Sequence, residues 1–138
     1  MSRVLSFFLT VAIILAALAS CSTDEVNIFG YTNPDEPIEA LCGSTFIITQ
    51  VANPTTGYHW VFTEPIDSSY LELVGEWYIP LPNPEGKQGV GGHQQWEFRA
   101  VDPGATEISL AYIGPSVPTD TAWTAVFEVE VVCVAPYP

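Results

Sequence analysis

The chain has 138 residues, of which 16 are acidic and only three are lysine or arginine, so its formal net charge is −13 at pH 7. A surface this acidic repels nucleic-acid phosphates, which argues against a nucleic-acid-binding function. The length provides for one compact domain and not for two. The charge itself is consistent either with solubility or with attraction of a basic partner.

The first 20 residues are typical of a secretory signal peptide, because Arg3 precedes an apolar run over residues 4–19 that ends in small residues. The run is short for a membrane span, which takes about 20 apolar residues. It closes with Leu18-Ala19-Ser20-Cys21, which resembles a lipobox, the motif whose cysteine is lipidated and becomes the mature N-terminus. We therefore predict a lipid anchor at Cys21 on the extracytoplasmic side of the cell envelope. Ordinary cleavage and secretion is the alternative.

Residues 21–37 are polar and acidic and are predicted to be a tether, whereas residues 38–138 form one β domain. Apolar residues alternate along this domain, as at Tyr58, Trp60 and Phe62, which is typical of half-buried antiparallel strands. We expect strands at 38–41, 45–51, 58–63, 70–78, 94–101, 106–113 and 122–134, with an additional short strand within 26–31. About seven such strands predict an all-β fold, an immunoglobulin-like antiparallel β-sandwich.

Two cysteines, Cys42 and Cys133, lie within the β domain. Outside the cytoplasm such a pair is more often a disulfide than two free thiols, although two buried free cysteines are the alternative. By strand alternation Cys42 shares a face with Phe46, and Cys133 shares a face with Val131. Both thiols are therefore expected to point into the core.

Nothing in the sequence predicts an enzyme. His59 and His93 are the only histidines, whereas a zinc site takes about three converging protein ligands. A cysteine nucleophile needs a thiolate beside a histidine, and both cysteines of the β domain are expected to be paired. Acidic residues such as Glu128 and Glu130 fall on solvent-facing strand positions. We therefore expect no catalytic residues, no metal and no cofactor.

Two loops carry distinctive motifs. The first is a sharp turn between two strands, in which proline and glycine favour the turn and two threonines lie at the tip with their hydroxyls expected to point outward: Asn53, Pro54, Thr55, Thr56, Gly57 and Tyr58. The second precedes the strand at 94–101 and is rich in glycine: Gly89, Val90, Gly91 and Gly92. Glycines allow this backbone to approach a binding partner closely.

Together these motifs resemble the chagasin family of inhibitors of papain-like cysteine peptidases, over about residues 38–134. The family pattern Asn-Pro-Thr-Thr-Gly-aromatic is matched throughout residues 53–58, and its Gly-x-Gly-Gly pattern is matched by residues 89–92. The resemblance implies an immunoglobulin-like sandwich that inserts three adjacent loops into the active-site cleft. It also implies that Thr55 and Thr56 lie at the catalytic cysteine of the peptidase.

The third loop departs from the family, which has Arg-Pro-Trp where this chain has Gly114, Pro115 and Ser116. Tryptophan and arginine are common interface hot spots, and losing one such anchor costs about 2 kcal/mol or more. Trp123 lies well downstream, in phase with the last strand, and is not expected to replace the missing anchor. Restoring arginine and tryptophan at positions 114 and 116 is expected to tighten binding.

The resemblance therefore predicts a reversible inhibitor of papain-like cysteine peptidases that acts by occlusion, without chemistry. The alternative is an envelope lipoprotein whose sandwich serves adhesion or assembly and lacks inhibitory activity. Gly114 and Ser116 favour that alternative, whereas the intact first and second motifs favour inhibition.

Overall fold

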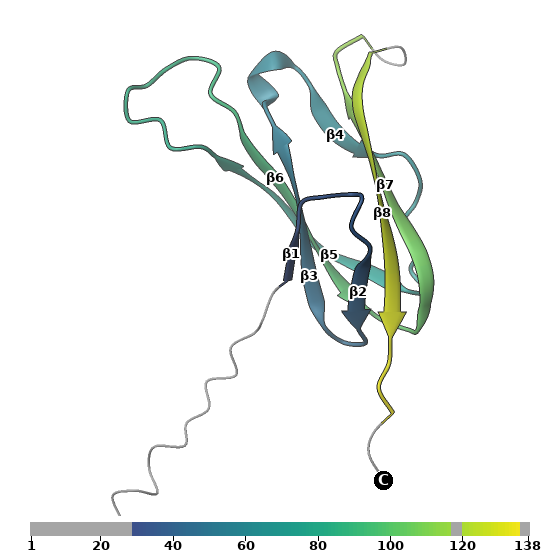
Figure 1. Cartoon of the computed structure of the whole chain (residues 1–138). Coiled ribbons are helices and arrows are strands. Elements are labelled where there is room, and N and C mark those ends of the chain that lie inside the picture. Colours follow the sequence, from purple (N-terminus) through teal and green to yellow (C-terminus); the bar gives the residue numbers. More distant parts are fainter. Residues whose placement is uncertain (1–28, 117–119, 136–138) are drawn as a thin grey trace, which may run out of the picture.

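Two four-stranded sheets face each other across an apolar core in the computed structural model, which describes residues 29–116 and 120–135 (Figure 1). The strands are β1 Phe29–Tyr31, β2 Ile38–Leu41, β3 Thr45–Ala52, β4 His59–Phe62, β5 Leu71–Pro80, β6 Gly92–Ala100, β7 Gly104–Ile113 and β8 Thr121–Val132. One sheet has the strand order β1-β3-β6-β5, and the other has the order β2-β8-β7-β4. The predicted β-sandwich is therefore confirmed.

Neighbouring strands pair antiparallel except at one edge of each sheet, where β1 runs parallel to β3 and β2 runs parallel to β8. Both edge strands are short. β1 covers only residues 46–48 of β3, and β2 covers only residues 129–132 of β8. Among the described residues, the end of β3 nearest the loop at 53–58 therefore has no strand neighbour on the β1 side. The end of β8 nearest the loop at 114–120 likewise has no strand neighbour on the β2 side.

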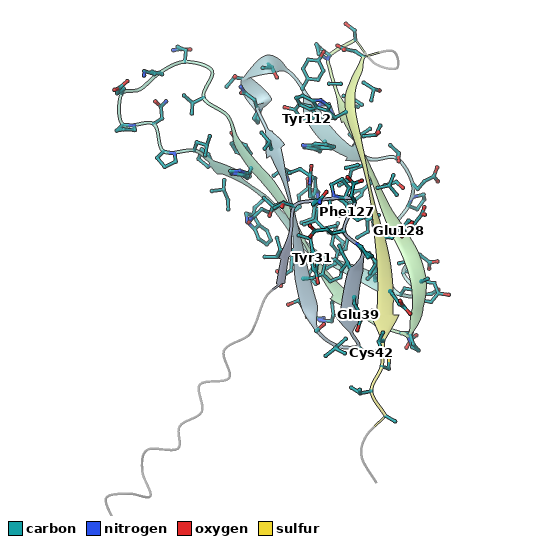
Figure 2. The ribbon with its side chains drawn as sticks, viewed as in Figure 1. Tyr31, Glu39, Cys42, Tyr112, Phe127 and Glu128 are labelled. Atoms are coloured by element: carbon teal, nitrogen blue, oxygen red, sulfur yellow. A yellow bond between two sulfur atoms is a disulfide. The ribbon has the colours of Figure 1, made fainter. Side chains whose placement is uncertain are left out.

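The core forms because apolar side chains alternate along the strands and point between the sheets. The largest fully buried side chains are Trp96, Phe46, Phe98, Phe127, Ile38, Ile48, Leu71, Ile108 and Leu110. Figure 2 shows the alternation on β8, where Phe127 lies inside the sandwich and Glu128 lies outside it. This inside-outside pattern fixes the register of the sheets, since a one-residue slip would expose the whole apolar set.

A disulfide joins Cys42, directly after β2, to Cys133, directly after β8. The two strands pair with Leu41 opposite Val132, so the next residues along each strand meet, with a Cα–Cα distance of 4.9 Å. The predicted bond is therefore confirmed. Cys42 is half-buried and packs against the core, whereas Cys133 is exposed. The expectation that both thiols point into the core is therefore wrong for Cys133, which lies beyond the end of β8 and past Val131, the last buried residue of that strand.

All seven predicted strands are present, and their ends differ from the predicted ones by at most two residues. The additional short strand expected within residues 26–31 is present as β1, and its Tyr31 ring packs edge-on against Phe46 with centroids 6.0 Å apart. The predicted signal peptide at 1–20 and Cys21 lie outside the described residues. Within the part of the chain that the structure describes, no helix is long and apolar enough to cross a membrane.

The disulfide closes a loop with a sequence separation of 91 residues, so its loss should destabilise the fold mainly by freeing the unfolded chain. We expect the double variant Cys42→Ala with Cys133→Ala to lower the free energy of unfolding by about 2–4 kcal/mol, and by no more than about 5 kcal/mol. Urea unfolding followed by circular dichroism measures this change. The native β spectrum should persist in the variant, and an unchanged unfolding midpoint would contradict the prediction.

Candidate functional site

Three loops emerge side by side at one end of the sandwich, the upper end in Figure 1. The first loop, residues 53–58, joins β3 to β4. The second loop, residues 81–91, joins β5 to β6. The third loop, residues 114–120, joins β7 to β8, and its residues 117–119 lie outside the described ones. The three predicted motifs are thus brought together by the strand order, although they are far apart in sequence.

The first loop is a single 3-10 turn, Pro54–Thr56, with none of its residues buried. Pro54 begins the turn, where its fixed φ is suited to helical backbone. Gly57 ends it with φ of 82° and donates its N–H to the Pro54 carbonyl at 3.1 Å. A left-handed residue is required at this point, which explains why glycine stands there.

The threonine hydroxyls of the first loop bond back to Asn53, and this corrects the expectation that they point outward. Thr55 Oγ1 donates to Asn53 Oδ1, and Thr56 Oγ1 donates to the Asn53 carbonyl, both at 2.6 Å. Both residues remain exposed. The hydroxyl protons are therefore used to hold the turn, and the tip is a compact, internally hydrogen-bonded feature.

Asn53 also ties the first loop to the other two parts of the site. Its side-chain Nδ2 donates to the Gly89 carbonyl of the second loop at 3.0 Å. Its backbone N–H donates to the Tyr112 hydroxyl, at the end of β7, at 2.7 Å. One asparagine thus accepts from Thr55, donates to the second loop and anchors the turn on the opposite sheet.

A second connection joins the first loop to the third. Tyr58 Oη donates to Asp120 Oδ1 at 2.6 Å, and the Gly114 N–H donates to the Asp120 carbonyl at 2.8 Å. This hydrogen bond to Asp120, together with partial burial and the negative charge nearby, raises the pKa of Tyr58 above its ordinary value. The tyrosine therefore remains a donor across the neutral pH range, and the two loops stay connected.

The glycines of the second loop are needed for packing inside the molecule. A Cβ at Gly91 would lie 2.9 Å from the Ala52 carbonyl oxygen. A Cβ at Gly92 would lie 2.2 Å from the Ile79 carbonyl oxygen, and Gly92 is buried at the start of β6. Gly89 has φ of 75°, with Thr55 Oγ1 at 4.0 Å from its ideal Cβ position, and Val90 is half-buried. Only part of the predicted second-loop contact set is therefore accessible to a partner.

Gly114 is also required by its neighbours. A Cβ there would lie 2.2 Å from the Asp120 carboxylate and 2.7 Å from the Tyr58 ring. An arginine at position 114 would therefore require Asp120 and Tyr58 to move, which would disturb the hydrogen bond between them. Pro115 and Ser116 are exposed. The Pro115 ring lies 3.6 Å from the ideal Cβ position of Gly57 in the first loop.

Aromatic side chains of the second sheet support the loops in a row. Trp60 of β4, Tyr112 of β7 and Trp123 of β8 lie on adjacent strands, with ring centroids 5.0 Å apart for Trp60 and Tyr112 and 5.3 Å apart for Tyr112 and Trp123. Trp60 continues into the core through an edge contact with Trp96 at 6.4 Å. The outer end of the row, Trp123, is 61% exposed.

The sequence places Trp123 in phase with the last strand but does not predict its exposure beside the loops. Alternation places it correctly on the inner face of β8 but does not show that, among the described residues, neither edge strand covers this end of the sandwich. The signal that could have found it is strand pairing across the third loop, which places Trp123 directly opposite Tyr112. Within residues 29–116 and 120–135, no group of three or more histidine, cysteine or acidic side chains is placed to hold a metal ion.

Comparison with known proteins gives a family and a fold. Residues 40–131 match the family model described as chagasin family peptidase inhibitor I42. The crystal structure of the cysteine protease inhibitor EhICP2 from Entamoeba histolytica is similar, with a TM-score of 0.63 and 20% identity over 76% of this chain and 96% of that one. The solution structure of amebosin is also similar, with a TM-score of 0.55 and 27% identity over 78% of this chain and 98% of that one. Comparison with curated protein sequences gives no significant match.

Because Asn53 joins the first and second loops through its amide nitrogen, Asn53→Asp should loosen the second loop. The carboxylate still accepts from Thr55 but cannot donate to Gly89, and it repels the Gly89 carbonyl. We expect the backbone order parameters of Gly89 and Val90 to fall toward the flexible range, below about 0.6, with little change in melting temperature. Asn33→Asp is the matched control, since it makes the same change in a turn at 33–36, away from the second loop. Unchanged order at Gly89 would contradict the role of Asn53.

Proposed function

The chain belongs to the chagasin family of peptidase inhibitors, whose members are not enzymes, and we propose that it inhibits papain-like cysteine peptidases reversibly by placing its three loops in the active-site cleft. The first loop enters as the central wedge, with Thr55 and Thr56 at the catalytic cysteine. The second and third loops contact the walls of the cleft on either side, through Gly89, Val90, Pro115 and Ser116.

The observation that carries this proposal is the cross-linked first loop. Its tip is exposed, yet its position is set by hydrogen bonds from Asn53 to Gly89 and Tyr112 and from Tyr58 to Asp120. A binding loop that is ordered before it meets its target loses little conformational entropy on binding. This order would offset part of the affinity lost with the family's Arg-Pro-Trp pattern, which the third loop lacks.

The shape of the first loop also supports occlusion without cleavage. The 3-10 turn at Pro54–Thr56 is held closed by the Thr56 and Gly57 N–H groups, which donate to Asn53 and Pro54 at 3.1 Å. A peptidase cleaves an extended peptide laid across its nucleophile, and a closed turn does not supply one. The wedge would thus occupy the nucleophile's position without offering it a bond to attack.

We also propose that lipidation of Cys21 holds the inhibitor at the cell envelope, on the extracytoplasmic side. The support is the Leu18-Ala19-Ser20-Cys21 run after the apolar leader, and the disulfide between Cys42 and Cys133, which is typical of proteins outside the cytoplasm. At this location the inhibitor would act on secreted or foreign peptidases.

Charged side chains at the wedge tip should abolish inhibition, because they cannot enter a closed interface without losing their hydration. We expect Thr55→Lys with Thr56→Lys to raise the inhibition constant against papain by at least about 100-fold, which corresponds to about 2.7 kcal/mol. The fold should persist, since both residues are exposed. Thr63→Lys, just past the other end of β4, is the control for added charge.

Titration of papain with the mature protein, residues 21–138, measures these constants. Unchanged potency of the double variant would exclude the wedge. If the wild-type protein does not inhibit at all, the adhesion or assembly function of an envelope lipoprotein becomes the better explanation.

The anchor is tested by cell fractionation. Wild-type protein should partition with membranes, because two or more acyl chains hold a protein far more firmly than one. Cys21→Ala should leave an unprocessed precursor or release the protein into the soluble fraction. A wild-type protein that is fully soluble and begins at Ser20 would show that cleavage occurs behind Ala19, without a lipid.

A further inference from the structure

Trp123 is a large apolar side chain held in place yet mostly exposed. It is 61% exposed, although its ring stacks on Tyr112 at 5.3 Å between centroids and 15° between planes. Tyr112 is buried and accepts the hydrogen bond from Asn53. The indole is therefore fixed on one side by the same residue that anchors the first loop, and much of its remaining surface faces solvent.

The space beside Trp123 is an apolar cavity continuous with the first loop. It has a volume of about 360 Å³. Its other walls come from the first loop, β3 and β8, and include Val51, Asn53, Thr56, Tyr58 and Ala122. Trp123 also lines a second cavity of about 300 Å³, together with Trp60 and Gln50. The indole thus borders two recesses.

The short edge strands leave this region open. β2 ends its pairing with β8 at Val129, and β1 ends its pairing with β3 at Ile48. Trp123 and Val51 lie beyond those points, on the side toward the loops, and Val51 is 67% exposed. Neither edge strand among the described residues covers them, so a partner approaching the first loop meets this apolar edge as well.

We propose that Trp123 is the aromatic anchor of the inhibitory surface, and that it packs against an apolar side chain on the rim of the target peptidase's cleft. This inference rests on the proposed function. Three features of the site select that partner. First, Asn53 and Thr56 belong to the wedge and also line the cavity. Second, the third loop lacks the family's tryptophan. Third, stacking on Tyr112 fixes the indole, so that little side-chain entropy is lost on contact.

The first test is an inhibition constant. Trp123→Ala should weaken inhibition of papain by about 30-fold, the loss expected of a tryptophan hot spot. Trp123→Phe should restore most of the potency, since a phenyl ring keeps both the stacking on Tyr112 and an apolar surface. Val126→Ala, which truncates an apolar side chain that is 44% exposed on the same strand, is the matched control and should leave the constant unchanged.

The second test separates contact from support, because Trp123→Ala also removes the stacking partner of Tyr112. The chain has four tryptophans, so the mature protein labelled with 5-fluorotryptophan gives a separate fluorine resonance for each, and the Trp123→Phe variant identifies that of Trp123. On addition of unlabelled papain the Trp123 resonance should shift and lose its solvent exposure. The resonance of Trp96, which is 1% exposed, should not.

The outcomes distinguish this inference from the function on which it rests. If the wild-type protein inhibits papain while the Trp123 resonance and the Trp123→Ala constant stay unchanged, inhibition stands and Trp123 is no anchor. If wild type forms no complex, both proposals are overturned. If Trp123→Ala instead abolishes self-association seen by sedimentation, the apolar edge is an interface between copies of this chain, and the peptidase contact is excluded.

Discussion

Two hydrogen bonds from one sheet to the other set the position of the first loop. Trp60 Nε1 donates to the Val51 carbonyl at 3.0 Å, and the Asn53 N–H donates to the Tyr112 hydroxyl at 2.7 Å. Val51 and Asn53 lie at the end of β3, whereas Trp60 and Tyr112 belong to the opposite sheet. The Trp60 indole N–H and the Tyr112 hydroxyl thus each have a hydrogen-bond partner, as buried tryptophan and tyrosine side chains usually do. These bonds help to fix the separation of the sheets at the end that carries the loops.

The aromatic rings connect this end to the core. Trp60 contacts both Tyr112 and Trp96, and Phe62 contacts Trp96 and Phe98. A displacement of the loop base would therefore disturb packing deep between the sheets, and close-packed interiors resist such changes. The rigidity that a preorganised inhibitor needs thus comes from the same apolar contacts that stabilise the fold.

Much of the fold and of the site could be predicted because it depends on local pattern. Alternation located the strands, cysteine number located the disulfide, and turn residues such as Pro54 and Gly57 located the first loop. The missed features depend on neighbours distant in sequence. Gly114 is glycine because Asp120 and Tyr58 fill its surroundings, and Trp123 is exposed because two edge strands stop early. Alternation reports which face a residue occupies, but it does not report where a sheet stops being covered.

The direction of β1 determines how the protein would be oriented on a membrane if it is attached through Cys21, as proposed. β1 runs parallel to β3, and β3 leads into the first loop, so the chain enters the sandwich from the pole opposite the three loops. Eight peptide units separate Cys21 from Phe29, a reach of at most about 29 Å. A membrane-attached copy would therefore stand close to the bilayer with its loops facing outward. An arriving enzyme would meet the free pole first, without competing with lipid for space.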